Sequence, residues 1–282
     1  MRLRLTLVAA KRQGSFTLNY AYYLSSAIYS WIEQSSPEYS AFLHQKGYSP
    51  EGLHRRFKHF CFSQLVVPDR RIDGGRLHFR SSKIHWYVGM PVDATLQHLV
   101  TGMFEKREFF IEREDNRFLI EQIEVLPEPE WKSSMTFRLL SPVTVSVPEQ
   151  RNGRLVPRYL RVDDPLLSEA LRTNIVNKYR SLYGENGLEG AKPFQCAFDQ
   201  HFIASRGGPE RVSKLITIKE GRTDETKVRG FLCPVNIEGD IDLIKLAYES
   251  GLGEKNSMGF GMMETVPDDK ARGSHESEKA QT

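Results

Sequence analysis

Four glycines surround a Lys-Asn-Ser centre in the segment Gly251–Gly261, near the end of the chain. Glycine adopts positive φ readily and lets a ligand approach the main chain closely. Successive backbone N–H groups of such a loop can bind an anion, and the ammonium of Lys255 would add positive charge. The spacing therefore indicates an anion cradle.

The glycine spacing matches neither of two familiar nucleotide-binding loops. A dinucleotide fingerprint lies between a strand and a helix, and a Walker loop ends in Gly-Lys-Ser/Thr. Here the loop follows a helical pattern over 240–248 and precedes a strand-like run over 260–266. This order disfavours a nucleotide-binding enzyme. A structural loop, whose glycines merely let Leu252, Met258 and Phe260 pack, remains the alternative to anion binding.

Two side chains with acid–base chemistry, Tyr29 and His44, lie off the apolar stripes of their predicted helices. Tyr29 directly follows Ile28, and His44 directly follows Leu43. At 100° per residue, both point about 100° or more away from the core. Two consecutive helices could bring them together for proton transfer without a metal. The alternatives are a boundary tyrosine and a surface histidine favoured by the helix dipole.

The acidic residues do not favour a metal-dependent nuclease. Paired aspartates at 163–164 and 268–269 fall at a predicted helix start and in a polar tail, where capping and solvation explain them. Cys61, Cys196 and Cys233 lie far apart without a CxxC pair, so neither a zinc site nor a disulfide framework is indicated. We therefore expect neither a metal nor a cofactor.

The elements that would position Tyr29 and His44 follow a β-α-β-β-α-β order. Leu3, Leu5 and Leu7 alternate with polar residues, as in a strand buried on one face. The following helix has a core stripe made of Leu24, Ala27, Ile28, Trp31 and Ile32. Ser36 and Pro37 predict the start of a second helix, which should end at Gly47. Strands are then predicted over 60–67, 76–80 and 84–88, a helix over 91–104, and a hairpin through 109–111 and 118–125.

Residues 127–130, with the sequence Pro-Glu-Pro-Glu, mark the best domain boundary. A second cycle of elements follows: a strand over 135–147, a helix over 163–183, strands over 194–203, 212–218 and 228–235, the helix at 240–248 and a last strand. The predicted fold is α+β, with two tandem ferredoxin-like (RRM-like, βαββαβ) domains at 1–129 and 130–266. Residues 267–282 are polar and are predicted to be disordered.

The 282 residues carry a net charge of +3, too weak by itself to indicate nucleic acid. Local basic clusters carry that argument instead, and one of them, at 55–58, includes Phe57. Basic and aromatic side chains together suit contacts to phosphates and stacking on bases. No apolar run approaches the roughly 20 residues of a membrane span, so we expect a cytoplasmic protein with no membrane partner.

The glycine loop fits the G-h-G-x5-G-h-G signature, with h apolar, of the repeat-associated mysterious protein superfamily of CRISPR systems. Segments 22–29, 42–44 and 60–63 resemble the pre-crRNA endoribonucleases, the sixth of the Cas families. The likeness covers residues 1 to about 266 and includes a Leu140-Ser141-Pro142 turn. It implies two ferredoxin-like domains and cleavage of repeat RNA without metal, leaving a 2′,3′-cyclic phosphate and a 5′-hydroxyl.

The resemblance also implies an active site of Tyr29, His44 and Lys58. His44 would deprotonate the 2′-hydroxyl or protonate the leaving 5′-oxygen, Lys58 would steady charge on the phosphorane, and Tyr29 would orient the hydroxyl or help as base. The stretch between His44 and Lys58 looks longer than in close relatives. Lys46 and Arg56 therefore remain substitutes for Lys58.

The same resemblance assigns RNA binding to the second half of the chain. The predicted residues are Gly251, Gly253, Lys255, Asn256, Ser257, Gly259 and Gly261 of the loop, together with Lys214 and Arg229. The partners it implies are CRISPR repeat RNA, as precursor and product, and other Cas effector subunits, with the protein as a monomer or homodimer. A non-catalytic RNA-binding subunit of an effector complex is the alternative function.

Overall fold

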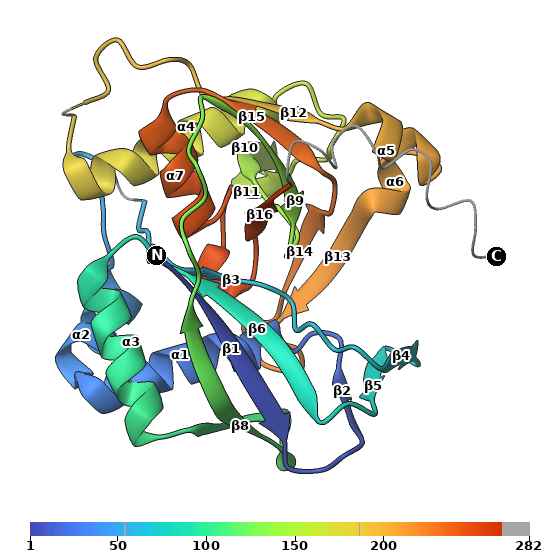
Figure 1. Cartoon of the computed structure of the whole chain (residues 1–282). Helices are drawn as coiled ribbons and strands as arrows, with labels where there is room; N and C mark the ends of the chain where they lie inside the picture. The colour runs from blue at the N-terminus through green and yellow to red at the C-terminus, as the bar shows by residue number, and fades with distance from the viewer. Residues whose placement is uncertain (54, 186, 267–282) are drawn as a thin grey trace.

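The computed structural model describes residues 1–53, 55–185 and 187–266. Two halves lie one above the other in Figure 1, the N-terminal half in blue to green below and the C-terminal half in yellow to red above. The predicted disordered tail, 267–282, lies outside the described residues. No helix of the described part is long and apolar enough to cross a membrane.

The N-terminal sheet has the strand order β3-β6-β1-β8-β7, all antiparallel. Its strands are β1 (Arg2–Ala9), β3 (Cys61–Phe62), β6 (Lys83–Gly89), β7 (Glu108–Ile111) and β8 (Arg113–Val125). Helix α1 (Ala21–Ser35) connects β1 to β3, and α3 (Asp93–Glu105) connects β6 to β7 and β8. Leaving out β7, this is the ferredoxin-like order. The predicted burial of Leu3, Leu5 and Leu7 in β1 is confirmed, but the other face is covered in part as well, since Arg2 and Thr6 are also buried.

Helix α1 and the segment after it match the sequence closely. The predicted stripe of Leu24, Ala27, Ile28, Trp31 and Ile32 is buried in full. Ser36 caps α2 (Pro37–Ala41) by accepting a 3.2 Å hydrogen bond from the backbone N–H of Tyr39. The helix continues as a π-helical turn, η1 (Phe42–Lys46), and ends at Gly47 with φ 64°. The predicted end is therefore confirmed.

The C-terminal sheet has the strand order β12-β15-β9-β16, which repeats the ferredoxin-like order. Its strands are β9 (Ser134–Leu139), β12 (Gln195–Phe198), β15 (Val235–Glu238) and β16 (Met263–Thr265). Helices α4 (Leu167–Tyr183) and α7 (Ile241–Ser250) complete the unit around a second core. The predicted tandem ferredoxin-like fold is confirmed. The boundary at 127–130 stays a prediction.

Three predicted strands of the second half are wrong in extent. Residues 135–147 form β9 and the start of β10 (Ser146–Arg151), because the Leu140-Ser141-Pro142 turn interrupts them; β10 pairs with β11 (Arg154–Tyr159). Residues 194–203 change from β12 to α5 (Gln200–Ser205), because Asp199 caps that helix. Residues 228–235 are divided between β14 (Thr226–Phe231) and β15.

The remaining elements decorate the two units. In the N-terminal half, β2 (Gly14–Thr17), β5 (Arg76–Phe79) and β4 (Arg70–Asp73) form a small sheet. The predicted strand at 60–67 contributes only β3 to the main sheet. In the C-terminal half, α6 (Pro209–Val212) precedes the hairpin of β13 (Ser213–Ile218) and β14, and a 3-10 turn, η2 (Asn256–Met258), lies inside the glycine loop.

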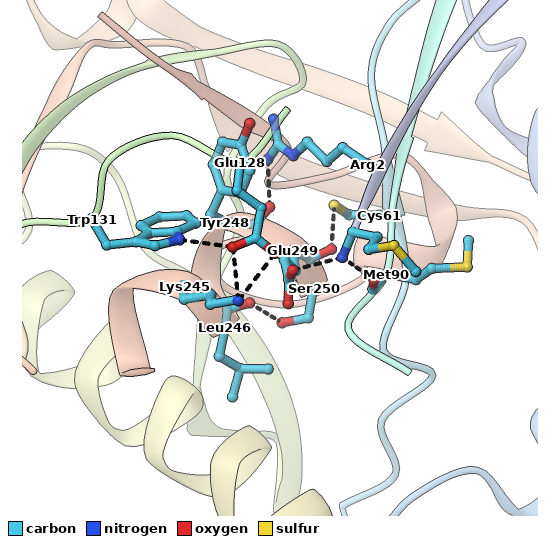
Figure 2. Close-up of polar contacts among 11 residues, drawn as sticks. Arg2, Cys61, Met90, Glu128, Trp131, Lys245, Leu246, Tyr248, Glu249 and Ser250 are labelled. Atoms are coloured by element: carbon cyan, nitrogen blue, oxygen red, sulfur yellow. Dashed lines mark hydrogen bonds and ion pairs between the residues drawn. The ribbon is translucent and has the colours of Figure 1, made fainter. Parts of the chain in front are cut away.

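The two halves are joined by contacts at the ends of β1, β3 and α7 (Figure 2). The guanidinium of Arg2 lies 3.2 Å from the ring centroid of Tyr248 and donates a hydrogen bond to the Tyr248 backbone oxygen. The thiol of Cys61 donates to the backbone oxygen of Glu249 over 3.4 Å. Arg2 is 3% exposed, so this contact is internal to the molecule.

Candidate active site

One face of α1 lies against the glycine loop. Ala21, Ser25 and Tyr29 recur every four residues and so share that face. A Cβ added to Gly259 would lie 3.0 Å from the Cβ of Ala21, and the Ser25 hydroxyl donates to the Met258 sulfur over 3.7 Å. Tyr29 misses the apolar stripe because it faces this loop from the other half of the chain.

The hydroxyl of Tyr29 lies next to the side chain of Ser257, which affects its pKa. Burial raises the pKa of Tyr29 to about 12, and Ser257 acts in the opposite direction. The phenol therefore stays protonated at neutral pH and can donate a hydrogen bond. Ser257 was predicted from sequence as an RNA-binding residue only, and its position beside Tyr29 was missed.

His44 lies beside Tyr29. The two ring centroids are 5.5 Å apart at an interplanar angle of 78°, while a second edge of Tyr29 packs against Phe60 at 5.6 Å. His44 is exposed on the π-helical turn η1, and such turns are frequent at functional sites. The structure thus brings together the two acid–base side chains that the sequence singled out.

Lys58 lies at the end of the helical segment that carries His44. Its ammonium donates to the backbone oxygens of Leu43 and His44, the latter over 2.9 Å. Burial lowers its pKa, and the positive charge of Arg56 adds to this effect. The lysine therefore stabilises the carbonyl end of η1, and its third N–H remains for another acceptor.

The two substitutes for Lys58 lie on the same turn or next to it. Arg56 donates to the backbone oxygen of Gln45 over 2.6 Å, and Lys46 is exposed within η1 itself. All three basic side chains are therefore near the carbonyl end of η1. Only Lys58 is half-buried and bonded to the His44 backbone, which favours it as the lysine that acts with His44.

The four glycines of the loop are enclosed by neighbouring segments of the chain. Gly251, Gly253, Gly259 and Gly261 are all buried. The N–H of Gly261 donates to Pro142 over 2.8 Å, and that of Gly259 donates to Asn256 over 3.0 Å. A Cβ at Gly261 would lie 2.0 Å from the Leu252 oxygen. These glycines permit close packing of the loop, and their predicted role in RNA binding stays a prediction.

The side chain of Asn256 is also fully used in hydrogen bonds within the protein. Its amide nitrogen donates to Leu252 and Phe260, over 3.2 and 3.0 Å, and its amide oxygen accepts from Lys178 over 2.7 Å. With both amide hydrogens used and 9% of its surface exposed, its side chain has no free donor for RNA. Within the loop, Lys255 and Ser257 are half-buried and remain accessible candidates.

The hairpin of β13 and β14 carries the other two predicted RNA-binding residues. Lys214 is exposed, and the half-buried Arg229 donates to the Ser213 hydroxyl over 3.2 Å. The turn of this hairpin reaches the segment before α1, where Glu220 accepts from Thr17 and Asn19 over 3.1 and 3.0 Å. The hairpin thus borders the same region as Tyr29, although its role in binding stays a prediction.

A cavity of about 300 Å³ lies beside the glycine loop. It is lined by Arg55, Arg56, Phe57, Ser146, Asn174 and Gly253 to Asn256. The guanidinium of Arg55 forms a 3.3 Å ion pair with Glu254 from the loop. Basic groups beside an aromatic ring suit a polyanion with stacking bases. The basic and aromatic cluster at 55–58 was identified in the sequence, but its position against the glycine loop was not predicted.

A metal-dependent reaction would need a cluster of metal-ligating side chains. No group of three or more His, Cys, Asp and Glu side chains that could hold a metal ion occurs among residues 1–53, 55–185 and 187–266.

Residues 15–124 match the family model "CRISPR-associated protein Cas6, N-terminal", and residues 126–265 match "CRISPR associated protein Cas6, C-terminal".

Two curated relatives match almost the whole chain. The CRISPR-associated endoribonuclease Cas6 1 of Methanocaldococcus jannaschii is 28% identical over 271 residues, 95% of this chain and 94% of the relative. The CRISPR-associated endoribonuclease Cas6 of Pyrococcus furiosus is 29% identical over 286 residues, 99% and 95% of the two chains. The solved structure of a Cas6-related protein from Pyrococcus furiosus has the same fold, with a TM-score of 0.78 at 23% identity, covering 95% of this chain and 99% of the other.

Proposed function

Since this chain belongs to the Cas6 family of CRISPR-associated endoribonucleases, we propose that it cleaves CRISPR repeat RNA in the precursor transcript to produce guide RNAs. The domains are 1–129 and 130–266, and the active site lies where they meet. The protein works in the cytoplasm and keeps its RNA product bound. Its metal-independent reaction is a transesterification.

The observation that carries this proposal is the placement of His44 against Tyr29, whose hydroxyl lies next to Ser257. In the reaction, the 2′-oxygen of RNA attacks the adjacent phosphorus and the bond from phosphorus to the 5′-oxygen breaks. The 2′-hydroxyl proton goes to a base, and the 5′-oxygen receives a proton. The products are a 2′,3′-cyclic phosphate and a 5′-hydroxyl, with no net oxidation.

His44 is the proton-transfer residue in this proposal. An imidazole can accept the 2′-hydroxyl proton or, once protonated, give one to the 5′-oxygen. Burial raises the pKa of Tyr29 to about 12, which favours its hydroxyl as a hydrogen-bond donor rather than as the base at neutral pH. Its hydroxyl donates to the nucleophile or to a phosphate oxygen, with Ser257 next to it.

Lys58 stabilises the negative charge that develops on the phosphorane. Its ammonium already holds the carbonyls of Leu43 and His44, so the charge lies on the same turn as the imidazole. A donor placed in advance at the developing charge stabilises the transition state more than the ground state. The lysine therefore serves both as a charge and as a support for η1.

RNA binding in this proposal uses the basic groups around the site. Lys255, Ser257 and the cavity arginines Arg55 and Arg56 hold the strand next to the scissile phosphate, and Lys214 and Arg229 hold it along the hairpin. Phosphate contacts of this kind weaken as salt rises, whereas base contacts determine which repeat is recognised. Other Cas effector subunits would receive the product RNA.

The test is cleavage of a labelled RNA carrying the repeat of the source genome, in excess EDTA, by the native protein, His44→Ala and His78→Ala. His78, exposed on β5, is the matched control. We expect one cut with a cyclic phosphate end, slowed by about 10²-fold or more only in His44→Ala. Binding without cutting by the native protein would identify the non-catalytic subunit instead. Cleavage that EDTA abolishes would contradict the metal-independent reaction.

A further inference from the structure

Helix α4 carries a lysine whose ammonium lies inside the molecule. Lys178 is 2% exposed, and its Nζ donates to the backbone oxygen of Gly251 and to the Asn256 amide oxygen, the latter over 2.7 Å. Both acceptors are uncharged and both belong to the glycine loop. A buried ammonium without a bonded carboxylate is costly to the fold, so its presence needs a reason beyond packing.

The bonds of Lys178 continue through Asn256 to both arms of the loop. The Asn256 amide nitrogen donates to Leu252 on the first arm and to Phe260 on the second. The next residue after Asn256 is Ser257, which lies next to the Tyr29 hydroxyl. An unbroken series of contacts therefore leads from the ammonium on α4 to the candidate catalytic tyrosine on α1.

We propose that Lys178 is a positioning residue for RNA cleavage: its ammonium holds the glycine loop in the conformation that presents Ser257 to Tyr29. This inference rests on the proposed function of the site. Lys178 itself touches no reacting group, because it is enclosed behind the loop. Its effect on the reaction passes through Asn256 and Ser257.

The positioning depends on the charge of Lys178 in the neutral pH range. Burial lowers the pKa of Lys178 to about 7, while Cys61 and Glu254 act in the opposite direction. Burial raises the pKa of Cys61 to about 11 and lowers that of His59 to about 3, so both are uncharged near neutral pH. The third facing group, Glu254, is paired with Arg55.

The lowered pKa of Lys178 determines how closure of the glycine loop depends on pH. Below pH 7 the ammonium makes charge-assisted hydrogen bonds to Gly251 and Asn256, which are the stronger kind. An opening of the loop that exposes Lys178 to water raises its pKa and takes up a proton near and above pH 7, so the closed loop is favoured further as the pH rises through 7. An arginine at this position would stay charged throughout.

The experiment compares the native protein with Lys178→Met, Lys178→Arg and the control Lys83→Met. Lys83 pairs with Glu121 on the surface. It is the first residue of β6, whereas Gly89, the last residue of β6, is the one that lies against α7. Two readouts are taken from pH 6 to 8.5: single-turnover cleavage of the repeat RNA, and amide hydrogen exchange of the peptide 251–261, corrected for the intrinsic rate. RNA affinity is measured alongside.

We expect Lys178→Met to slow cleavage by about 10-fold or more, as a displaced positioning group does, and to lower the exchange protection of the loop. RNA affinity should change less than about threefold, because no phosphate contact is lost. In the native protein the loop protection should rise as pH rises through 7, and in Lys178→Arg it should not.

Two results would overturn the inference. One is native-like loop protection in Lys178→Met at every pH. The other is a native protein whose loop protection does not change between pH 6 and 8.5. If the native protein fails to cut the repeat at all, the proposed function fails, and the exchange data still decide whether Lys178 holds the loop. A Lys178→Met protein that does not fold leaves the decision to the native pH series.

Discussion

The ring of Tyr29 is partly buried against Phe60 and His44, and its hydroxyl lies next to Ser257 of the glycine loop. Tyr29→Phe keeps the ring against His44 and Phe60 and removes only this hydroxyl. We expect single-turnover cleavage to slow by about 10²-fold, as when one transition-state donor is lost. The free energy of unfolding should change by about 1 kcal/mol.

The matched control for this change is Tyr23→Phe. Tyr23 belongs to the same helix, and its ring packs edge-on against Tyr22 at 5.9 Å. Cleavage by Tyr23→Phe should remain close to the native rate. Equal rates for the two variants would remove Tyr29 from the mechanism, whatever the position of its ring.

His59 gives the fold a pH dependence of its own. Burial lowers its pKa to about 3, and the charge of Lys178 acts in the same direction. An unfolded histidine titrates near 6.5, so the unfolded state binds more protons between these values, and stability falls as the pH drops below 6.5. We expect a loss of about 2 kcal/mol at pH 5 relative to pH 7 from this residue.

The check is urea unfolding at pH 5 and 7 of the native protein, His59→Asn and the exposed control His78→Asn. Asparagine suits the position because His59 has φ 50°, a left-handed conformation that Asn tolerates. The native protein and His78→Asn should lose stability in parallel, and His59→Asn should lose less. The same pH dependence in all three proteins would mean that His59 does not titrate as its burial implies.

Some residues of the candidate site could be predicted from the sequence. Tyr29 and His44 could be singled out because each departs from a clear apolar stripe, which is a local property. The contacts of Tyr29 with Ser257 and of Lys178 with Asn256 could not, since each joins residues on different elements distant in the chain. Their partners depend on how the second half packs against the first.

The helical segment from Pro37 to Lys46 shows what a single element contributes to the site. Its start at Ser36 and its end at Gly47 follow from capping rules and could be predicted. Its change to π-helical geometry at Phe42 has no comparable local signal. That change rotates His44 relative to an ideal α-helix, so the approach of its ring to Tyr29 required the structure.

Lys58 supports this element, and its removal should therefore affect folding and chemistry together. Lys58→Ala takes two donors from the carbonyl end of η1 and one positive charge from the site. We expect cleavage to slow by about 10-fold or more, with a loss of about 1 kcal/mol in unfolding free energy. Single-turnover rates and chemical unfolding measure the two effects.

Lys46→Ala is the companion variant, because Lys46 lies on the same turn and is exposed. It should change neither quantity appreciably. If Lys46→Ala slowed cleavage and Lys58→Ala did not, the catalytic lysine would be Lys46, one of the substitutes that the sequence left open.

The whole molecule places the candidate site between its two halves. Tyr29, His44 and Lys58 come from the N-terminal half, whereas Ser257 and Lys255 come from the glycine loop of the other (Figure 1). The repeated strand order was predictable from the order of hydrophobic patterns. The relative placement of the two sheets was not, because it depends on contacts such as that of Arg2 with Tyr248.

Arg2 and Arg4 offer a matched test of that placement, because they lie two residues apart on β1. Arg2 is buried against Tyr248 of α7, whereas the partly exposed Arg4 pairs with Glu124 of its own sheet over 2.8 Å. Arg2→Ala removes the buried hydrogen bond and the cation–π contact across the halves. It should lower the free energy of unfolding by roughly 2 kcal/mol, and Arg4→Ala should lower it less, because the ion pair of Arg4 is open to solvent.

The same pair of variants separates stability from alignment of the site. The backbone oxygen of Tyr248, which accepts from Arg2, lies three residues before Gly251, where the loop that carries Ser257 begins. A shift of α7 would therefore move Ser257 away from Tyr29, so Arg2→Ala should also slow single-turnover cleavage under conditions in which it remains folded. Arg4→Ala should cleave at the native rate. If both variants cleaved equally fast, the buried arginine would stabilise the protein without aligning its active site.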